Sequence, residues 1–241
     1  VGSEMCIRDR ETNPLLSRQP GIVAFSKVLT ESNTTHKSVP MLMSDITAYN
    51  FDSIYHQKGI ITAFKEAGYQ TAFFSNQRYN HSFIDFFGKE ADTFDFIKED
   101  SLDSAYNPSD DELLALVAKE LSKGNQKQFI VLHTYGSHFN YRERYPSEDA
   151  FFLPDYPVEA EVKYRDNLVN AYDNTIRYTD SFLSRLIHML EEQHVDAAML
   201  YTSDHGEDIF DDSRHLFLHA SPVPSYYQLH VPFLIWMSDT Y

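Results

Sequence analysis

The sequence predicts an α/β fold with a mostly parallel central sheet that is flanked by helices on both faces. Two observations lead to this prediction. Short apolar runs alternate along the chain with longer segments of helical spacing, a pattern typical of parallel sheets whose strands are joined by helices. In addition, 42% of the 241 residues are hydrophobic and 15% are aromatic, which is enough for a buried core. We therefore expect one α/β domain within residues 11–241.

Each element has its own signals. The segment 56–69 has helical spacing and ends at Gly68, a residue typical of a helix C-cap. The segment 108–124 opens with Pro108 and acidic residues and closes with Lys123 and Gly124, as helices commonly do. Strands are expected in the short apolar runs within residues 21–29, 70–76, 127–138, 196–206 and 230–241. The remaining helices are expected at residues 39–46, 80–91 and 158–193.

The ends of the chain differ from the rest. Residues 1–10, VGSEMCIRDR, have no hydrophobic period, and "MCIRDR" resembles translated sequencing-adaptor sequence, so we treat this segment as non-native. The only cysteine, Cys6, lies in it, which leaves the remaining chain without a disulfide or a thiol nucleophile. Because a predicted strand runs almost directly into the last residue, we expect residues 11–241 to be a fragment that is truncated at both ends.

The charge of the chain limits its partners. The formal net charge is −16, which argues against binding to nucleic acid and against adhesion to anionic lipid through a basic patch. No apolar run approaches the roughly 18 residues that a membrane span requires.

Polar clusters follow four of the predicted strands. In open α/β sheets, ligands gather at the carboxyl ends of the strands, so loops that follow different strands meet at one edge. We therefore expect these loops to form a single site. They are "SNTTH" (32–36), "SNQ" (75–77), "HTYGSH" (133–138) and "SDHGE" (203–207).

Asp204 and His205 offer a carboxylate oxygen and an imidazole nitrogen in the turn beyond a strand. This donor pair suits Zn²⁺ or Mn²⁺ and argues against Ca²⁺. Gly206 would allow the tight turn that directs both side chains to one ion. A solvated Asp-His-Gly turn is the alternative. Glu207 is compatible with a supporting role, with a second metal ion or with an exposed loop.

Three further histidines are candidates. His133 directly follows a strand, where a histidine is as often structural as functional. His138 lies in the loop itself and would serve as a donor to a charged substrate oxygen or as a metal ligand. His219 is a candidate for contact with a phosphate group.

Two threonines, Thr34 and Thr35, precede a predicted helix start. Threonine at an N-cap is often purely structural. A hydroxyl at this position also lies near the positive end of the helix dipole, which stabilises developing negative charge. A nearby metal ion would lower its pKa and make the hydroxyl a competent nucleophile.

Taken together, the motifs resemble the alkaline phosphatase and sulfatase superfamily. Within it they are most similar to the membrane-anchored phosphoethanolamine transferases that modify lipid A or other lipopolysaccharide sugars, a group that includes enzymes of colistin (polymyxin) resistance. The resemblance implies a three-layer sandwich, with residues 11–241 as a partial sulfatase-like catalytic domain. The motifs that carry it, in the order of the family, are "SNTTHKSVPMLMS", "VLHTYGSH" with "RYP", "NAYDNTIRYTD", "YTSDHGE", "LFLHASP" and "HVPFLIWMS".

The resemblance assigns a role to each candidate. Thr35 would be the nucleophile that becomes phosphoethanolaminylated, and Asp204, His205 and the Thr35 oxygen would bind a catalytic zinc ion. The residues that would contact the substrate are His138, His219, Asn76 and Gln77. For His138 and His219 the alternative is a second zinc ion. Those that would support the site or hold a second metal ion are Glu207 and His133. The family's remaining zinc ligand is a glutamate that would precede residue 11, and no glutamate of this chain matches it.

The resemblance also implies the partners. The donor would be phosphatidylethanolamine, and the acceptor would be lipid A or another lipopolysaccharide, with a covalent intermediate on threonine. The protein would be anchored in the inner membrane by N-terminal helices that this sequence lacks, with the catalytic domain facing the periplasm. Alternatives are a phosphoglycerol transferase, a phosphodiesterase, a sulfatase or a non-catalytic fragment. Sulfatase chemistry is disfavoured because Met41 and Leu42 stand where its arginine is required.

A first prediction concerns convergence. Because all four polar loops follow strands, the Thr35 hydroxyl, the Asp204 carboxylate and the His205 ring should lie within a few ångströms of one another. An experimental structure of the zinc-loaded protein would test this, and Thr35 at the opposite edge of the sheet from Asp204 would contradict it.

Overall fold

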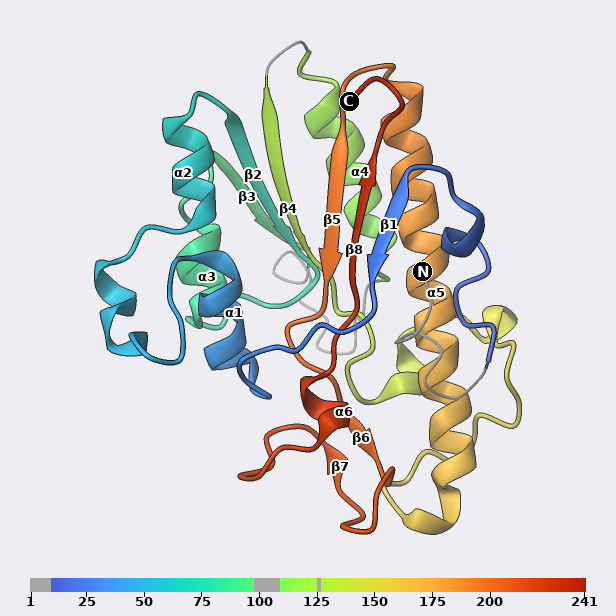
Figure 1. Cartoon of the computed structure of the whole chain (residues 1–241). Helices are drawn as coiled ribbons and strands as arrows, with labels where there is room; N and C mark the ends of the chain where they lie inside the picture. Colours follow the sequence, from blue (N-terminus) through green and yellow to red (C-terminus); the bar gives the residue numbers. More distant parts are fainter. Residues whose placement is uncertain (1–9, 98–108, 125–126) are drawn as a thin grey trace. The chain divides into compact units, whose positions relative to one another are not determined.

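The computed structural model describes residues 10–97, 109–124 and 127–241 (Figure 1). The chain forms two compact units, one of residues 1–33 with 136–241 and one of residues 34–135. Cys6, most of the segment that we treat as non-native, and the first residue of the helix expected at 108–124 lie outside the described residues. Among the described residues, no helix combines the length and the apolar character needed to cross a membrane.

The unit of residues 34–135 contains a parallel sheet in the order β3-β2-β4, built from β2 (Gln70–Ser75), β3 (Thr93–Phe96) and β4 (Gln128–His133). The side chains of residues 71–75 in β2 are all buried, although successive side chains of a strand point to opposite faces. Both faces of the central strand are therefore covered, as the sequence predicts for this part of the sheet.

The helices of this unit are α1 (Thr35–Met43), α2 (Ile60–Glu66), α3 (Phe83–Gly88) and α4 (Glu112–Leu121). Both α2 and α4 contact β2, and α1 packs against α3. A short 3-10 helix, η2 (Phe51–His56), lies between α1 and α2 in the chain. The core gathers around Phe73, whose buried neighbours are Ile61, Ile84, Ala91 and Phe96.

The unit that contains residues 136–241 has a different sheet, in the order β1-β8-β5. Its strands are β1 (Ile22–Phe25), β5 (Ala198–Thr202) and β8 (Phe233–Met237), and β8 runs antiparallel to both neighbours. The mostly parallel arrangement is therefore interrupted here. The reason is the connection: parallel neighbours need a crossover, usually a helix, but the only helix between β5 and β8 is α6 (Tyr226–Leu229).

The remaining elements of this unit are short, apart from one helix. A two-stranded ribbon, β6 (Asp208–Ile209) with β7 (Phe217–Leu218), follows β5 in the chain, and Figure 1 shows it with α6 beyond the carboxyl end of β5. The long helix α5 (Arg165–Glu192) begins later than the predicted residue 158, after the 3-10 turn η5 (Val162–Tyr164). Further 3-10 turns are η1 (Leu16–Arg18), η3 (Tyr141–Glu143) and η4 (Ser147–Asp149).

Most of the polar motif "NAYDN" (170–174) of α5 is buried, and its Asn174 holds the loop that contains Phe151 and Phe152. The Asn174 side chain is 1% exposed, and its Oδ1 accepts hydrogen bonds from the backbone N–H groups of Phe151 (3.0 Å) and Phe152 (2.8 Å). Its Nδ2 donates to the Tyr145 hydroxyl (3.1 Å), which in turn donates to Asp155 (2.9 Å). Asn174 thus replaces the water that the loop would otherwise need.

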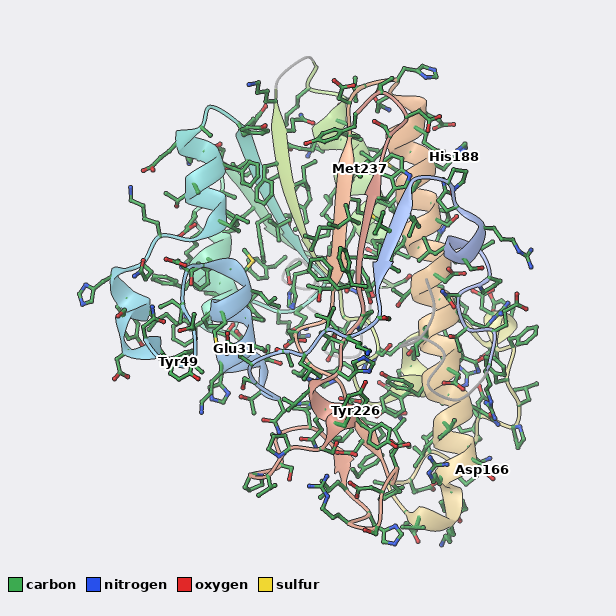
Figure 2. The ribbon with its side chains drawn as sticks, viewed as in Figure 1. Glu31, Tyr49, Asp166, His188, Tyr226 and Met237 are labelled. Carbon is green, nitrogen blue, oxygen red and sulfur yellow. The ribbon has the colours of Figure 1, made fainter. Side chains whose placement is uncertain are left out.

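We predict that Asn174→Ala lowers the free energy of unfolding by about 1–3 kcal/mol, because two partly buried N–H groups lose their acceptor. Urea unfolding monitored by circular dichroism measures the change. The control is His188→Ala on an exposed face of the same helix (labelled in Figure 2), whose ion pairs with Glu191 and Glu192 contribute little. Equal unfolding midpoints for the two variants would show that the loop does not depend on Asn174.

Candidate active site

The loop that follows β5 places a carboxylate beside an imidazole. The Asp204 Oδ2 and His205 Nε2 atoms are 3.5 Å apart, and only 8% of the His205 side chain is exposed. His205 Nδ1 lies 3.0 Å from the carbonyl oxygen of Gly206, and the Ser203 hydroxyl donates to the carbonyl oxygen of His205 (2.6 Å). The carbonyl contact makes Nδ1 the protonated nitrogen, so the neutral ring carries its lone pair on Nε2.

A lone pair that faces a carboxylate oxygen is repelled unless a cation or a proton lies between the two atoms. The 3.5 Å separation suits a metal ion, because two ligand atoms of a tetrahedral zinc site with bonds of about 2.0–2.1 Å lie roughly 3.3 Å apart. Asp204 and His205 therefore fit two positions of a zinc site. Among the described residues, no group of three or more histidine, cysteine, aspartate or glutamate side chains is arranged to hold a metal ion.

Gly206 has a steric rather than a conformational role. A Cβ atom at this position would lie 2.1 Å from the carbonyl oxygen of Tyr227 and 3.1 Å from that of His230. The Gly206 N–H donates to the carbonyl oxygen of Gln228 (2.9 Å), which draws the loop against the backbone of α6 (marked in Figure 2 by the label Tyr226). Glycine is therefore required at this position because another backbone approaches too closely for a side chain.

Glu207 lies between a tyrosine and a histidine. The buried Tyr141 hydroxyl donates to Glu207 Oε2, and His219 Nδ1 lies 3.2 Å from Glu207 Oε1. The hydrogen bond to Glu207 raises the pKa of His219 above its usual value, against the opposing effect of burial. Of the alternatives for Glu207, the structure favours a supporting contact, because both carboxylate oxygens are engaged by protein groups.

Three histidine rings lie close together in this unit. The His205 and His219 ring centroids are 4.0 Å apart, and those of His138 and His219 are 6.3 Å apart. His138 is exposed, its Nδ1 lies 2.6 Å from the carbonyl oxygen of Phe139, and Arg144 Nε donates to the carbonyl oxygen of His138 (3.1 Å). The predicted residues His138, Asp204, His205, Glu207 and His219 are therefore neighbours in space or in the chain.

The backbone around His219 is strained on both sides. Leu218 (φ 64°) and Ala220 (φ 66°) adopt the left-handed conformation, which is unfavourable for residues other than glycine. The Ala220 N–H donates to the carbonyl oxygen of Asn33 (3.1 Å) and so helps to hold this geometry. Arg165, at the start of α5, ties down the preceding ribbon by donating to the carbonyl oxygen of Phe210 (3.1 Å) and to Asp211 (2.8 Å).

Thr35 belongs to the other unit, where it is the first residue of α1. Thr34 is the N-cap, and its side chain makes no capping hydrogen bond. The Thr34 carbonyl oxygen instead accepts from the N–H groups of Lys37 (3.0 Å) and Ser38 (2.9 Å), which closes the first turn. Thr35 therefore lies at a helix N-terminus, because α1 begins four residues before the helix expected at 39–46, while its convergence with Asp204 and His205 stays a prediction.

The other residues predicted in this unit have internal partners. Asn76 is buried and donates through Nδ2 to Asp110 Oδ1 (2.7 Å), which also accepts from the Tyr135 N–H (2.8 Å). His133 Nδ1 lies 2.8 Å from the Ser75 hydroxyl. Gln77 is half-buried, and its N–H donates to that same hydroxyl (3.1 Å). Of these residues, the geometry leaves Gln77 as the better candidate for substrate contact.

Comparison with known proteins shows the family to which this chain belongs. The family model described as "Sulfatase" matches residues 6–241, nearly the whole chain. The chain belongs to the sulfatase family. The predicted resemblance and the alkaline phosphatase/sulfatase-like fold are therefore confirmed.

The similar sulfatase-family proteins include phosphoethanolamine transferases. Phosphoethanolamine transferase EptA of Escherichia coli K12 is 30% identical over 249 residues, covering 96% of this chain and 43% of the relative. The Kdo(2)-lipid A phosphoethanolamine 7''-transferase of the same strain is 35% identical over 136 residues, covering 54% of this chain and 23% of the relative. This chain therefore spans less than half of either relative.

A solved structure of this kind superposes closely. The soluble domain of lipooligosaccharide phosphoethanolamine transferase A from Neisseria meningitidis matches with a TM-score of 0.85 and 29% identity, covering 96% of this chain and 70% of that one.

We predict that Gly206→Ala destabilises the protein by about 1–3 kcal/mol and weakens zinc binding, because the added Cβ displaces the loop of Asp204 and His205. Thermal unfolding and zinc calorimetry test the two effects. The matched control is Gly68→Ala, where the space is open but φ is +84°, so stability falls by about 1–2 kcal/mol while zinc binding stays the same. Unchanged zinc affinity in Gly206→Ala would contradict the role given to the loop.

Proposed function

We propose that this chain is the catalytic part of a phosphoethanolamine transferase, which transfers phosphoethanolamine from phosphatidylethanolamine to lipid A or another lipopolysaccharide sugar. Membership of the sulfatase family and the names of the two Escherichia coli relatives support the proposal. The observation that carries it is the pairing of Asp204 Oδ2 with His205 Nε2 at 3.5 Å in the loop after β5. This pair offers mixed oxygen and nitrogen ligands where the reaction requires a metal ion.

The metal ion of this proposal is zinc, with Mn²⁺ as the less suitable alternative. Asp204, His205 and the Thr35 oxygen would hold it, and His138 with His219 would contact the transferred phosphate or hold a second zinc ion. When bound, the ion supplies positive charge that lowers the pKa of the threonine hydroxyl and stabilises negative charge on the phosphoryl group. Gln77 and Asn76 remain proposed substrate contacts, and Glu207 and His133 remain proposed supports.

The reaction has two transfers. Thr35 Oγ attacks the phosphorus atom of phosphatidylethanolamine and loses its proton, while the bond from phosphorus to the diacylglycerol oxygen breaks and that oxygen takes up a proton. A hydroxyl of the acceptor sugar then attacks the same phosphorus atom, which restores the Thr35 hydroxyl and releases the product. His219 and His138 would stabilise the charge on the phosphoryl oxygens in both steps.

The proposed substrates are lipids, so the proposal includes a membrane. The protein would be held at the inner membrane by helices outside the given sequence, with its catalytic domain facing the periplasm. Because both donor and acceptor are amphipathic, a site at the membrane surface would meet each in turn, and a covalent intermediate removes the need to bind both at once.

We predict that, in the full-length protein, Thr35→Ala abolishes both transfer and hydrolysis of phosphatidylethanolamine, because the nucleophile is lost. Thr34→Ala is the matched control and should retain most activity, since Thr34 makes no side-chain cap and its backbone contacts survive the change. Mass spectrometry after incubation with phosphatidylethanolamine should find the phosphoethanolamine adduct on the peptide that contains Thr35.

Escherichia coli EptA under the same conditions is the positive control for donor turnover. An adduct located on Thr34, or normal turnover in Thr35→Ala, would contradict the assignment. Donor hydrolysis without transfer to any lipopolysaccharide sugar would instead indicate a phosphodiesterase.

A further inference from the structure

A second group of residues supports His219 from the side of the protein core. Tyr141 is fully buried, and its ring packs edge-on against Phe139 (5.4 Å between centroids) and Tyr172 (5.1 Å). Its hydroxyl donates to Glu207, and only 6% of the Glu207 side chain is exposed. The second carboxylate oxygen of Glu207 lies 3.2 Å from His219 Nδ1. A continuous chain of hydrogen bonds therefore runs from the aromatic core to the histidine.

We propose that Tyr141 and Glu207 are positioning residues for the transfer reaction: the Tyr141 hydroxyl fixes the Glu207 carboxylate, and the carboxylate fixes the ring of His219 through Nδ1. This proposal rests on the proposed function, in which His219 contacts the transferred phosphate. Tyr141 has no role in the sequence motifs considered above, because its importance comes from a contact with a residue 66 positions away.

The burial of the carboxylate argues for a fixed geometry. A carboxylate removed from water is unfavourable unless hydrogen bonds replace its hydration, and here Tyr141 and His219 each engage a different oxygen. The Tyr141 ring is packed within the aromatic cluster, which keeps its hydroxyl next to Glu207.

A fixed Glu207 decides which nitrogen of His219 is available. Rotation of the ring by about 180° about the Cβ–Cγ bond exchanges Nδ1 with Cδ2 and Nε2 with Cε1, so the Nδ1 contact with Glu207 favours one orientation and one tautomer. Nε2 is then the atom that faces the substrate, and it donates to a phosphoryl oxygen when the ring carries a second proton. The ring also lies against that of His205 at 4.0 Å, so a change in its orientation would reach the neighbouring site.

The test uses two variants that keep the packing. Tyr141→Phe removes only the hydroxyl, and Glu207→Gln keeps the shape of the side chain but removes its charge and one acceptor oxygen. Tyr172→Phe is the matched control, because it removes a hydroxyl from the same aromatic cluster while the Tyr141 hydroxyl and Glu207 stay unchanged. The tautomer of His219 is measured by ¹⁵N long-range NMR, and kcat and KM are measured with a fluorescent phosphatidylethanolamine.

We expect Nδ1 of His219 to be protonated in the parent protein and the tautomer to shift toward Nε2–H in Glu207→Gln. Tyr141→Phe should lower kcat about threefold to tenfold, with KM changed less than about twofold, because a lost hydrogen bond weakens positioning for a charge that develops in the reaction. Tyr172→Phe should change neither the tautomer nor kcat.

The outcomes separate this proposal from the proposed function. A His219 tautomer that is unaffected by Glu207→Gln would overturn the positioning chain, whatever the activity. A shifted tautomer with unchanged kcat in both variants would also overturn it, since positioning would then have no effect on the reaction. If the full-length protein turns over no phosphatidylethanolamine while the tautomer shifts as expected, the proposed substrate is wrong and the hydrogen-bonded chain stands.

Discussion

Gln228, on the short helix α6, joins three segments of the chain through hydrogen bonds. Its Nε2 donates to Asp208 (2.6 Å), its Oε1 accepts from Asn33 Nδ2 (2.6 Å), and its carbonyl oxygen accepts from the Gly206 N–H (2.9 Å). The side chain is 1% exposed, so water does not compete for these groups. The loop of Asp204 and His205, the strand that follows it and the segment before α1 therefore have their positions fixed by one residue.

Several acidic residues in the unit that contains residues 136–241 accept hydrogen bonds that stabilise the fold. Burial raises the pKa of Asp208, and hydrogen bonds from Ser225 and Gln228 act against this effect. Asp180 on α5 accepts from the N–H groups of Leu15 and Leu16 at 2.9 Å each, which holds η1 on the helix. A net charge of −16 thus overstates how acidic the surface is, because some carboxylates serve as internal acceptors.

The sequence predicted well what local signals determine. Strand β2 and helix α4 were found because their apolar runs and end signals lie within the elements themselves. Strand β3, four residues long, was missed, since a run this short has no period of its own. The antiparallel direction of β8 within a mostly parallel fold was not predicted, because direction depends on the length and kind of the connection and not on the residues of the strand.

The candidate site shows the same difference between features that local sequence signals predict and features that depend on distant contacts. Asp204, His205 and His219 were proposed from residue type and motif, and the structure brings them together. Asn76 shows the limit of that reasoning: a polar residue directly after a strand has the same signature whether it contacts a substrate or supports a neighbouring segment, and here its Nδ2 also donates to Asp110. Tyr141 was not found because no local pattern distinguishes a tyrosine that supports a distant carboxylate from one that only packs.

Helix α5 holds the segment that leads to His219. The helix rises about 1.5 Å per residue, so its 28 residues form a rod of roughly 42 Å. Arg165 at one end holds the β6–β7 ribbon that leads to His219, and Asp180, farther along, holds η1. For the segment that carries His219 to open, its contacts with the first turns of α5 must therefore break. In hydrogen exchange, the amides of the ribbon should behave as one cooperative unit with those turns, so that the loop moves by local unfolding rather than as a free lid.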